Sequence, residues 1–284
     1  DAFPKYKASI EKLKAECLMK KRQYSDAMVV YEEILSKRPI PWAMVGLAQA
    51  QIAQRQYENA ATVLRETISK FPMVLEAYDL LADCQMQQQE FDDAQQTLQD
   101  AIKKSPRVIK RQSKLGEVAV ENGDYDTSIS AFKQTIRLGE NSIFKSPDSY
   151  IHYTNSVSKK VTADEGKVAK SLANEAENYL KDFYKEYKHD KVCKLRGSVA
   201  EGNFFMSQGK QDEAKKCTEQ AKELYSTIDT MLPANAGLEL AQGLQNLGEE
   251  DIAEEIIKDA ELNKSGLYFQ PPITIIISKK ITKL

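Results

Sequence analysis

Three carboxylates in the sequence have a spacing that could support chemistry. Glu76, Asp79 and Asp83 follow one another at intervals of three and four residues, which places them on one face of an α-helix. Paired carboxylates can act as general acid and base or hold a divalent cation. No other type of metal ligand accompanies them, and charged runs are more often a solvated helix face. We therefore favour a solvated face and predict no metal site.

Cysteines and histidines give no clearer signal for catalysis. Cys17, Cys84, Cys193 and Cys217 include no Cys-x-x-Cys pair. Cys17 and Cys84 occupy equivalent places in a sequence repeat, which predicts small core residues rather than nucleophiles. His152 has no serine or cysteine nucleophile that a motif would match to it. We therefore predict a non-enzymatic protein with reduced thiols, without catalytic residues and without a cofactor.

The composition narrows the classes of partner. Charged residues make up 29% of the 284 residues and leave a formal net charge of −2, so the chain has no overall basic field for nucleic acid or anionic lipid. With 12 glycines and 9 prolines, long helices are favoured over a turn-rich β fold. No apolar run reaches the roughly 20 residues that span a bilayer. We expect a cytoplasmic protein with no membrane span and no small-molecule substrate.

A short sequence motif recurs along the chain and predicts the helices that must position these side chains. The aromatic residues Tyr24, Tyr57, Phe91 and Tyr125 follow one another at steps of 33, 34 and 34 residues. Three residues after each lies a small residue, and a large apolar residue follows four positions further on. A second amphipathic segment with its own small residue precedes each copy of this motif. The pattern predicts pairs of helices whose small residues let the backbones approach.

This pattern resembles the tetratricopeptide repeat. One unit carries the repeat's residues in order: Tyr78, Leu81, Ala82, Ala94, Leu98 and Pro106. The resemblance implies an all-α fold, a right-handed superhelical solenoid of helix-turn-helix units whose first helices line a concave face. Residues 1–140 would form four regular units, and residues 141–264 about three divergent ones.

The C-terminal tail, residues 265–284, departs from the repeat. Pro271 and Pro272 end any helix, and the Ile-rich run at 273–277 has β character. An exposed apolar strand favours association, so a homodimer through the tail is one expectation. Residues 267–270 read LYFQ, which resembles part of a protease-cleavage linker, so sequence added to the natural chain is an alternative origin for part of the tail.

The candidate residues for a binding groove lie on the first helices of the repeats. Helical spacing predicts a mixed groove, with an apolar patch around Trp42 and acidic residues beyond it. The candidates are Trp42, Val45, Gln49, Ile52, Glu76, Asp79, Asp83, Met86, Lys110 and Glu117. Trp42 either caps the junction between the first two units or anchors a partner peptide.

A narrower resemblance rests on three stretches, at residues 38–60, 76–83 and 143–150. They read RPIPWAMVGLAQAQIAQRQYENA, EAYDLLAD and IFKSPDSY, and they resemble the tetratricopeptide region of bacterial response regulators with an N-terminal phospho-receiver domain. The chain begins at Asp1 rather than Met, and the resemblance implies that a receiver precedes it. The solenoid would then be the output arm of a two-component phosphorelay. Its partner would be a histidine kinase, a chemosensory protein or another signalling protein.

Two other functions stay open. The chain could be an assembly factor for a secretion, pilus or envelope complex. It could also regulate nucleic acid, because residues 102–114 hold six basic residues and no acidic one. The acidic surroundings and the lack of interleaved aromatic residues favour a solvated corner or a protein contact instead. We favour a non-enzymatic protein-interaction scaffold.

Overall fold

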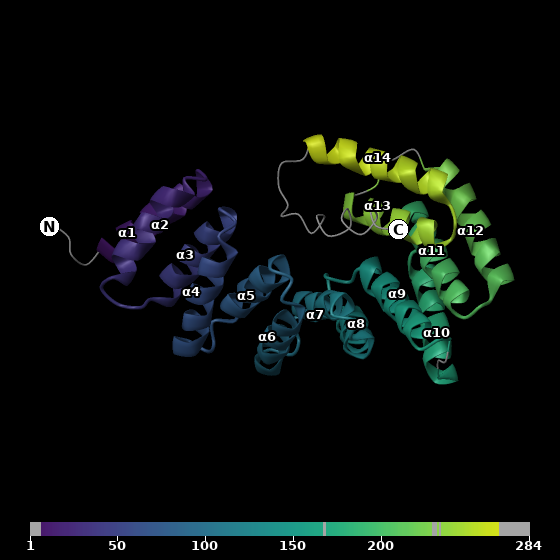
Figure 1. Cartoon of the computed structure of the whole chain (residues 1–284), viewed down its shortest axis with the longest axis horizontal. Coiled ribbons are helices and arrows are strands. Elements are labelled where there is room, and N and C mark those ends of the chain that lie inside the picture. Colours follow the sequence, from purple (N-terminus) through teal and green to yellow (C-terminus); the bar gives the residue numbers. More distant parts are fainter. Residues whose placement is uncertain (1–6, 167–168, 229–231, 233, 267–284) are drawn as a thin grey trace. The chain divides into compact units, whose positions relative to one another are not determined.

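The computed structural model describes residues 7–166, 169–228, 232 and 234–266 of the chain. Within these residues it contains fourteen α-helices and no strand (Figure 1), which confirms the all-α prediction. The predicted β-like run of the tail falls in residues 267–284 and lies outside the described part. The helices are α1 (Lys7–Lys20), α2 (Tyr24–Leu35), α3 (Pro41–Ala53), α4 (Tyr57–Lys70), α5 (Leu75–Gln87), α6 (Phe91–Lys104), α7 (Ile109–Glu121), α8 (Tyr125–Gly139), α9 (Pro147–Ala163), α10 (Lys170–Glu186), α11 (Lys191–Ser207), α12 (Gln211–Ser226), α13 (Ala234–Asn246) and α14 (Glu250–Gly266).

The chain forms two compact units, residues 1–123 (unit 1) and 124–284 (unit 2). In unit 1 each helix packs on the next one along the chain, from α1 to α7. In unit 2, α8 packs on α9, α9 packs on both α10 and α11, and α11 packs on both α12 and α13. Within each unit the odd-numbered helix is therefore the first helix of a pair and the even-numbered helix the second. By their places in the sequence repeat, α7 and α8 correspond to a first and a second helix. The predicted change from regular to divergent repeats at residue 140 stays a prediction.

The turn inside most helix pairs contains a residue in the left-handed region, which fixes the repeat register. This residue has a positive φ at Arg22, Arg55, Gln89, Gly123, Gly209 and Gly248. At Gln89 the backbone N–H donates to the carbonyl oxygen of Met86, and the next N–H, from Glu90, donates to Gln85. These two bonds close the end of α5 in the manner of a Schellman motif. The same pair of bonds follows α1, α3, α11 and α13.

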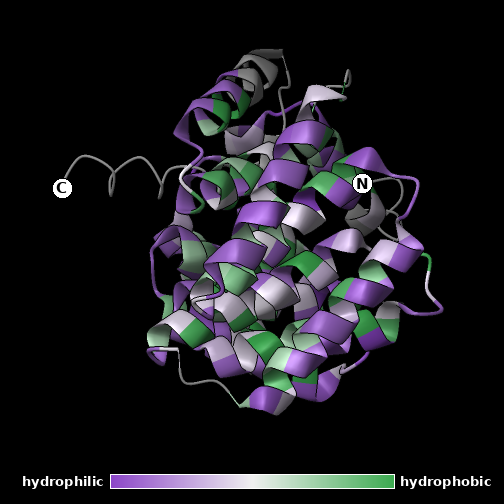
Figure 2. Ribbon diagram, turned by 90° about the vertical axis from the view of Figure 1, so that its right-hand side faces the viewer, coloured by the Kyte–Doolittle hydropathy of each residue, from purple (hydrophilic) through white to green (hydrophobic). Residues whose placement is uncertain are grey.

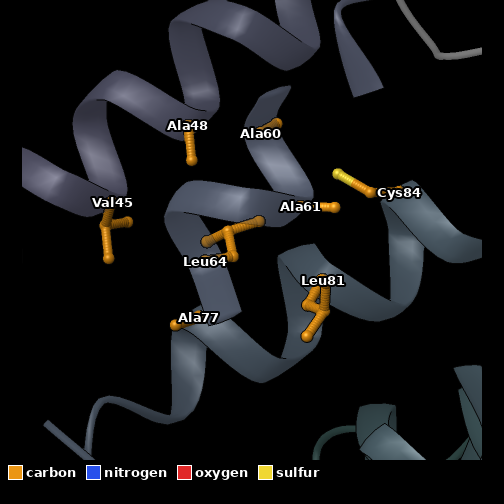
Figure 3. Close-up of a cluster of buried hydrophobic side chains, with 8 residues drawn as sticks. All are labelled: Val45, Ala48, Ala60, Ala61, Leu64, Ala77, Leu81 and Cys84. Carbon is orange, nitrogen blue, oxygen red and sulfur yellow. The ribbon is translucent and has the colours of Figure 1, made fainter. Parts of the chain in front are cut away.

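Alanine residues bring the helices of unit 1 together. Figure 3 shows Ala60, Ala61 and Leu64 of α4 between side chains of α3 and α5. Leu64 and its alanine neighbours are 0% exposed. Because an alanine projects little beyond the backbone, three helices can meet around one large residue. Fully burying such a leucine contributes about 2 kcal/mol.

Most helices are amphipathic, as a repeat stack requires. Figure 2 shows hydrophobic and hydrophilic residues alternating along the ribbons of the described part. On α6, the buried residues Ala94, Leu98 and Ala101 recur at helical spacing, while Asp92 and Asp93 are exposed. One face of each such helix therefore packs into the core, and the opposite face is exposed to solvent.

Left-handed turn positions give a test of the fold. Gly123 has φ +75°, and a Cβ added there would have no atom within 4 Å. We expect Gly123→Ala to lower the free energy of unfolding by about 1 kcal/mol, because only backbone strain is added. Gln89→Gly, at the equivalent position, should not lower it, because relief of strain offsets the entropy that glycine gains when unfolded. Urea unfolding of both variants measures the difference, and equal losses would contradict the assignment.

Candidate functional site

Equivalent positions of α3, α5 and α7 form a common surface in unit 1, which we call the first-helix surface. Ten residues were predicted there from the sequence: Trp42, Val45, Gln49, Ile52, Glu76, Asp79, Asp83, Met86, Lys110 and Glu117. Glu76, Lys110 and Glu117 are exposed, and all the others except Val45 are half-buried. The structure therefore leaves nine of the ten accessible to solvent.

Val45 has almost no surface available to a partner. It is 5% exposed and belongs to the core cluster that contains Ala48 and Leu64 (Figure 3). Its counterpart in α5 is the half-buried Asp79. The difference is chemical, because an aliphatic side chain at this position gains by packing inward and a carboxylate by remaining at the surface.

Asp79 is held by an arginine of the next first helix. Arg111 on α7 donates from Nε to Oδ1 of Asp79 at 2.7 Å and from Nη2 to Oδ2 at 2.7 Å. Arg111 is only 5% exposed. A two-bond contact of this kind is the strongest geometry between guanidinium and carboxylate. It fixes α5 against α7 at the surface.

The other two predicted carboxylates also have partners on neighbouring first helices. Lys114 of α7 forms an ion pair with Asp83, and Gln49 of α3 donates to Glu76 at 2.8 Å. Together with the Asp79 contact, these form a polar ladder across α3, α5 and α7. In the described residues no group of three or more His, Cys, Asp or Glu side chains is placed to hold a metal ion. The carboxylates act as contacts between repeats.

Trp42 lies at the junction of the first two helix pairs. Its ring packs edge-on against Tyr31 of α2, with centroids 6.4 Å apart. Lys12 of α1 lies over the ring, with its Nζ 5.5 Å from the centroid. Trp42 stays half-buried. It thus covers the junction and still presents part of its ring to solvent.

The cysteines differ in exposure. Cys84, Cys193 and Cys217 are buried, and burial raises the pKa of each thiol to about 12. Such thiols contain almost no nucleophilic thiolate at neutral pH. The expectation that Cys17 is a core residue like Cys84 was wrong, because Cys17 is exposed. Its equivalents are covered by the second helix of a preceding pair, and no such helix precedes α1 in the described residues.

The basic corner at residues 102–114 is partly neutralised. Arg111 and Lys114 are paired with Asp79 and Asp83, and Lys103 forms an ion pair with Asp100 at 2.8 Å. Phosphate contacts by these three side chains would compete with a carboxylate already in place.

Unit 2 contains a charged cluster that sequence reasoning missed. Arg196 on α11 donates from Nη1 to Asp148 on α9 at 2.6 Å and from Nη2 to Glu239 on α13 at 2.7 Å. Asn155 donates to Oε1 of Glu239 at 3.0 Å, and His152 Nε2 lies 3.5 Å from the same oxygen. The cluster links three successive first helices. The sequence signal that could have indicated this cluster was Arg196 itself, the single charge within the run LRGSVA.

The cluster strongly favours its ionised carboxylates. Burial alone would raise the pKa of Glu239, but the hydrogen bond and positive charge of His152, together with Arg196, lower it to about 2. Burial likewise opposes the ionised form of Asp148, and the Ser146 hydrogen bond and the Arg196 charge still lower its pKa. Arg196 is 9% exposed, so its buried charge depends on these two carboxylates for neutralisation.

This lowered pKa gives a prediction for Glu239→Gln. The ionised group stabilises the fold above its ordinary pKa of 4.5, and this contribution is lost as the pH falls through about 2. We expect the variant to be less stable at neutral pH by about 2 kcal/mol and to approach the parent protein as the pH falls across that interval. Urea unfolding at a series of pH values measures this. Glu213→Gln, at an exposed carboxylate of α12, is the control and should show no such convergence.

None of the described helices is long and apolar enough to span a membrane. Residues 51–116 match the tetratricopeptide repeat family. No functionally curated protein matches the sequence.

Several solved structures are similar in fold. A tetratricopeptide repeat protein from Parabacteroides merdae aligns with a TM-score of 0.62 at 13% identity, over 96% of this chain and 96% of that chain. PilF from Pseudomonas aeruginosa aligns with a TM-score of 0.51 at 15% identity, over 80% and 96%. A double mutant of MamA RS-1 aligns with a TM-score of 0.50 at 11% identity, over 78% and 97%. The predicted fold class is thereby confirmed: the chain has the solenoid fold of tetratricopeptide repeat proteins.

Proposed function

We propose that the chain is a non-enzymatic scaffold that binds a protein partner on the first-helix surface of unit 1. The observation that carries this proposal is the polar ladder, which holds polar side chains of α3, α5 and α7 in fixed positions. A surface whose side chains are ordered in advance loses less conformational entropy when a partner binds. Tetratricopeptide repeats in general present such surfaces to other proteins.

The chemistry of the surface favours a partner with mixed apolar and polar side chains. Trp42, Ile52 and Met86 provide half-buried apolar surface, while Glu76 and Lys110 provide exposed charges of opposite sign. Aromatic residues at interfaces contribute much of the binding energy. We therefore expect Trp42 to be the principal anchor and the charges to select orientation.

The finer proposal places this scaffold in bacterial two-component signalling, in the cytoplasm. It rests on the resemblance of residues 38–60, 76–83 and 143–150 to the output region of receiver-containing response regulators. The partner would be a histidine kinase, a chemosensory protein or another response regulator. A tetratricopeptide assembly factor for an envelope complex is the alternative, and it would use the same surface with a different partner. The pairing of Arg111 and Lys114 with carboxylates supports protein rather than nucleic acid as the ligand.

Capture of a partner tests the proposal. The full chain is used to isolate proteins from bacterial lysate, and each protein identified is then purified and titrated against the chain. We expect Trp42→Ala and Glu76→Lys each to weaken binding at least tenfold, about 1.4 kcal/mol. Glu58→Lys, an exposed change on α4, should leave affinity unchanged. Because Trp42 also packs at a junction, Glu76→Lys separates loss of the surface from loss of stability.

The identity of the partner decides between the two finer functions. A kinase, chemosensory protein or response regulator that binds through these residues would support the signalling role. Envelope-assembly components would support the alternative. Equal binding by the parent chain, Trp42→Ala and Glu76→Lys would exclude the first-helix surface of unit 1 as the binding site.

A further inference from the structure

The first helix leaves an apolar face in solvent. On α1, Ile10 is 60% exposed and Leu13 is 59% exposed, and Cys17 is exposed as well. Intervals of three and four residues place these side chains on one face of the helix. Large apolar residues grouped on one exposed face mark a surface that another element covers.

The same face is covered on the later first helices of unit 1. Counted from the repeated aromatic residue, the counterparts of Ile10, Leu13 and Cys17 are all buried or half-buried. They are Ala43, Gly46 and Ala50 on α3, and Ala77, Leu80 and Cys84 on α5. The second helix of the preceding pair covers them: α2 packs on α3 and α4 packs on α5. The side chain of Tyr31 on α2, for example, fills the space where a Cβ on Gly46 would lie.

The last described second helix, α14, has a large apolar residue at the position that covers such a face. Its preceding turn residue, Gly248, has a positive φ like Arg22, which sets the register. Ile257 then corresponds to Tyr31 and Leu64, the large residues that α2 and α4 direct into the junction with the following pair. Ile257 is half-buried. No first helix follows α14 in the described residues.

The side chains at the two ends are compatible in size. At the α4–α5 junction, Leu64 lies in the core cluster and Leu80 packs against that cluster, so two branched aliphatic residues share one layer. Leu13 is the counterpart of Leu80, and Ile257 is the counterpart of Leu64. An α14–α1 junction would therefore repeat a combination that the chain already uses.

Each end face also carries a charge at a position where internal junctions are mostly apolar. Lys14 on α1 is exposed, whereas its counterparts on later first helices are the buried residues Leu47, Leu81 and Leu115. Glu254 on α14 has a side chain that is 69% exposed. Its counterparts, Met28 and Ala61, belong to or pack against the cores of the α2–α3 and α4–α5 junctions. The two charges are opposite in sign, and the counterparts Leu81 and Ala61 belong to one core cluster.

The charges of the two helices as wholes are complementary too. The sequence of α1 contains four lysines and two glutamates. That of α14 contains six carboxylates and two lysines. Opposite net charges attract at long range and speed association, more strongly at low salt.

From these observations we propose that the protein associates head to tail, with α14 of one copy docking on the exposed face of α1 of the next. The contact continues the packing of a second helix on a following first helix across two copies. It is heterologous, so a pair of associated copies keeps one unused α1 face and one unused α14 face, and addition of further copies is open. The first-helix surface of unit 1 takes no part in it, so self-association and partner binding are independent.

Charge reversal tests the proposal on the full chain. Sedimentation velocity at low salt should show a mass that rises with concentration beyond that of a dimer. Lys14→Glu alone and Glu254→Lys alone should each reduce the protein to a monomer. The chain carrying both reversals should associate again, because the attraction is restored with its signs exchanged.

Matched controls lie on the same two helices. Lys20 of α1 corresponds to Ala53 on α3, Gln87 on α5 and Glu121 on α7, and all three are exposed. Glu255 of α14 corresponds to Val29, Thr62 and Gln96, which are also exposed. Lys20→Glu and Glu255→Lys change net charge by the same amount as the test variants, and each should leave the association as it is.

Cys17 provides a second, local measurement. It is the one exposed cysteine of the four, and it lies on the proposed contact face. The rate of its alkylation by a maleimide should fall as the concentration of the parent chain rises. The rate in Glu254→Lys should not depend on concentration, because that variant cannot cover α1.

Three results would each overturn the proposal. The parent chain could remain a monomer at all soluble concentrations. Association could survive both single reversals, which would place the contact elsewhere. It could also survive Glu254→Lys but not Lys14→Glu, which would show that something other than α14 covers α1.

Discussion

The packing of unit 1 depends on the close approach of each second helix to the first helix of the next pair. A single helix pair cannot bury its apolar face alone, so each pair is stable only against its neighbours. Small residues make the approach possible: Ala43 and Ala77 are 0% exposed, and Gly46 leaves room for the ring of Tyr31. The larger residues then fill the space that remains, as Leu64 does between α3 and α5 (Figure 3).

Buried arginines add a second kind of contact between successive pairs. In unit 1, Arg111 of α7 binds Asp79 of α5, and in unit 2, Arg196 of α11 binds Asp148 of α9 and Glu239 of α13. Removing a guanidinium from water is costly unless a carboxylate compensates its charge. A register that separated these ion pairs would leave a buried positive charge uncompensated. Apolar packing sets the distance between pairs, and the arginines set their alignment.

Local periodicity could be predicted from the sequence, whereas contacts between distant residues could not. The recurring aromatic residue located the helix pairs of the first half, because helix packing imposes a fixed spacing on each unit. The carboxylates at positions 76, 79 and 83 were recognised as a surface feature, but their partners on α3 and α7 lie about one repeat away. The Glu239 cluster joins residues as far apart as Asn155 and Glu239, which are separated by 84 positions, and no local pattern predicts which of many charges will meet.

Exposure was hardest to predict at the ends of the array. Because Cys17 and Cys84 occupy equivalent positions of the repeat, we predicted that Cys17 is buried like Cys84. The prediction was wrong because equivalent positions need not have the same neighbouring helices. A position is buried only if the adjoining pair is present to cover it. The same reasoning applies to Ile10 and Leu13, whose exposure follows from their place on the first described helix.

The charges at the two ends decide which kind of self-association is physically reasonable. A symmetric contact between two α1 faces would bury Ile10 and Leu13 but would also bring Lys14 of each copy toward the other, and like charges at a desolvated contact oppose binding. A contact between two α14 faces would oppose Glu254 to itself in the same way and would bury little apolar surface. The pairing of unlike ends joins the apolar face of α1 to a helix with Ile257 at the covering position and brings a lysine toward a glutamate. Charge therefore opposes the symmetric contacts and favours the proposed head-to-tail contact.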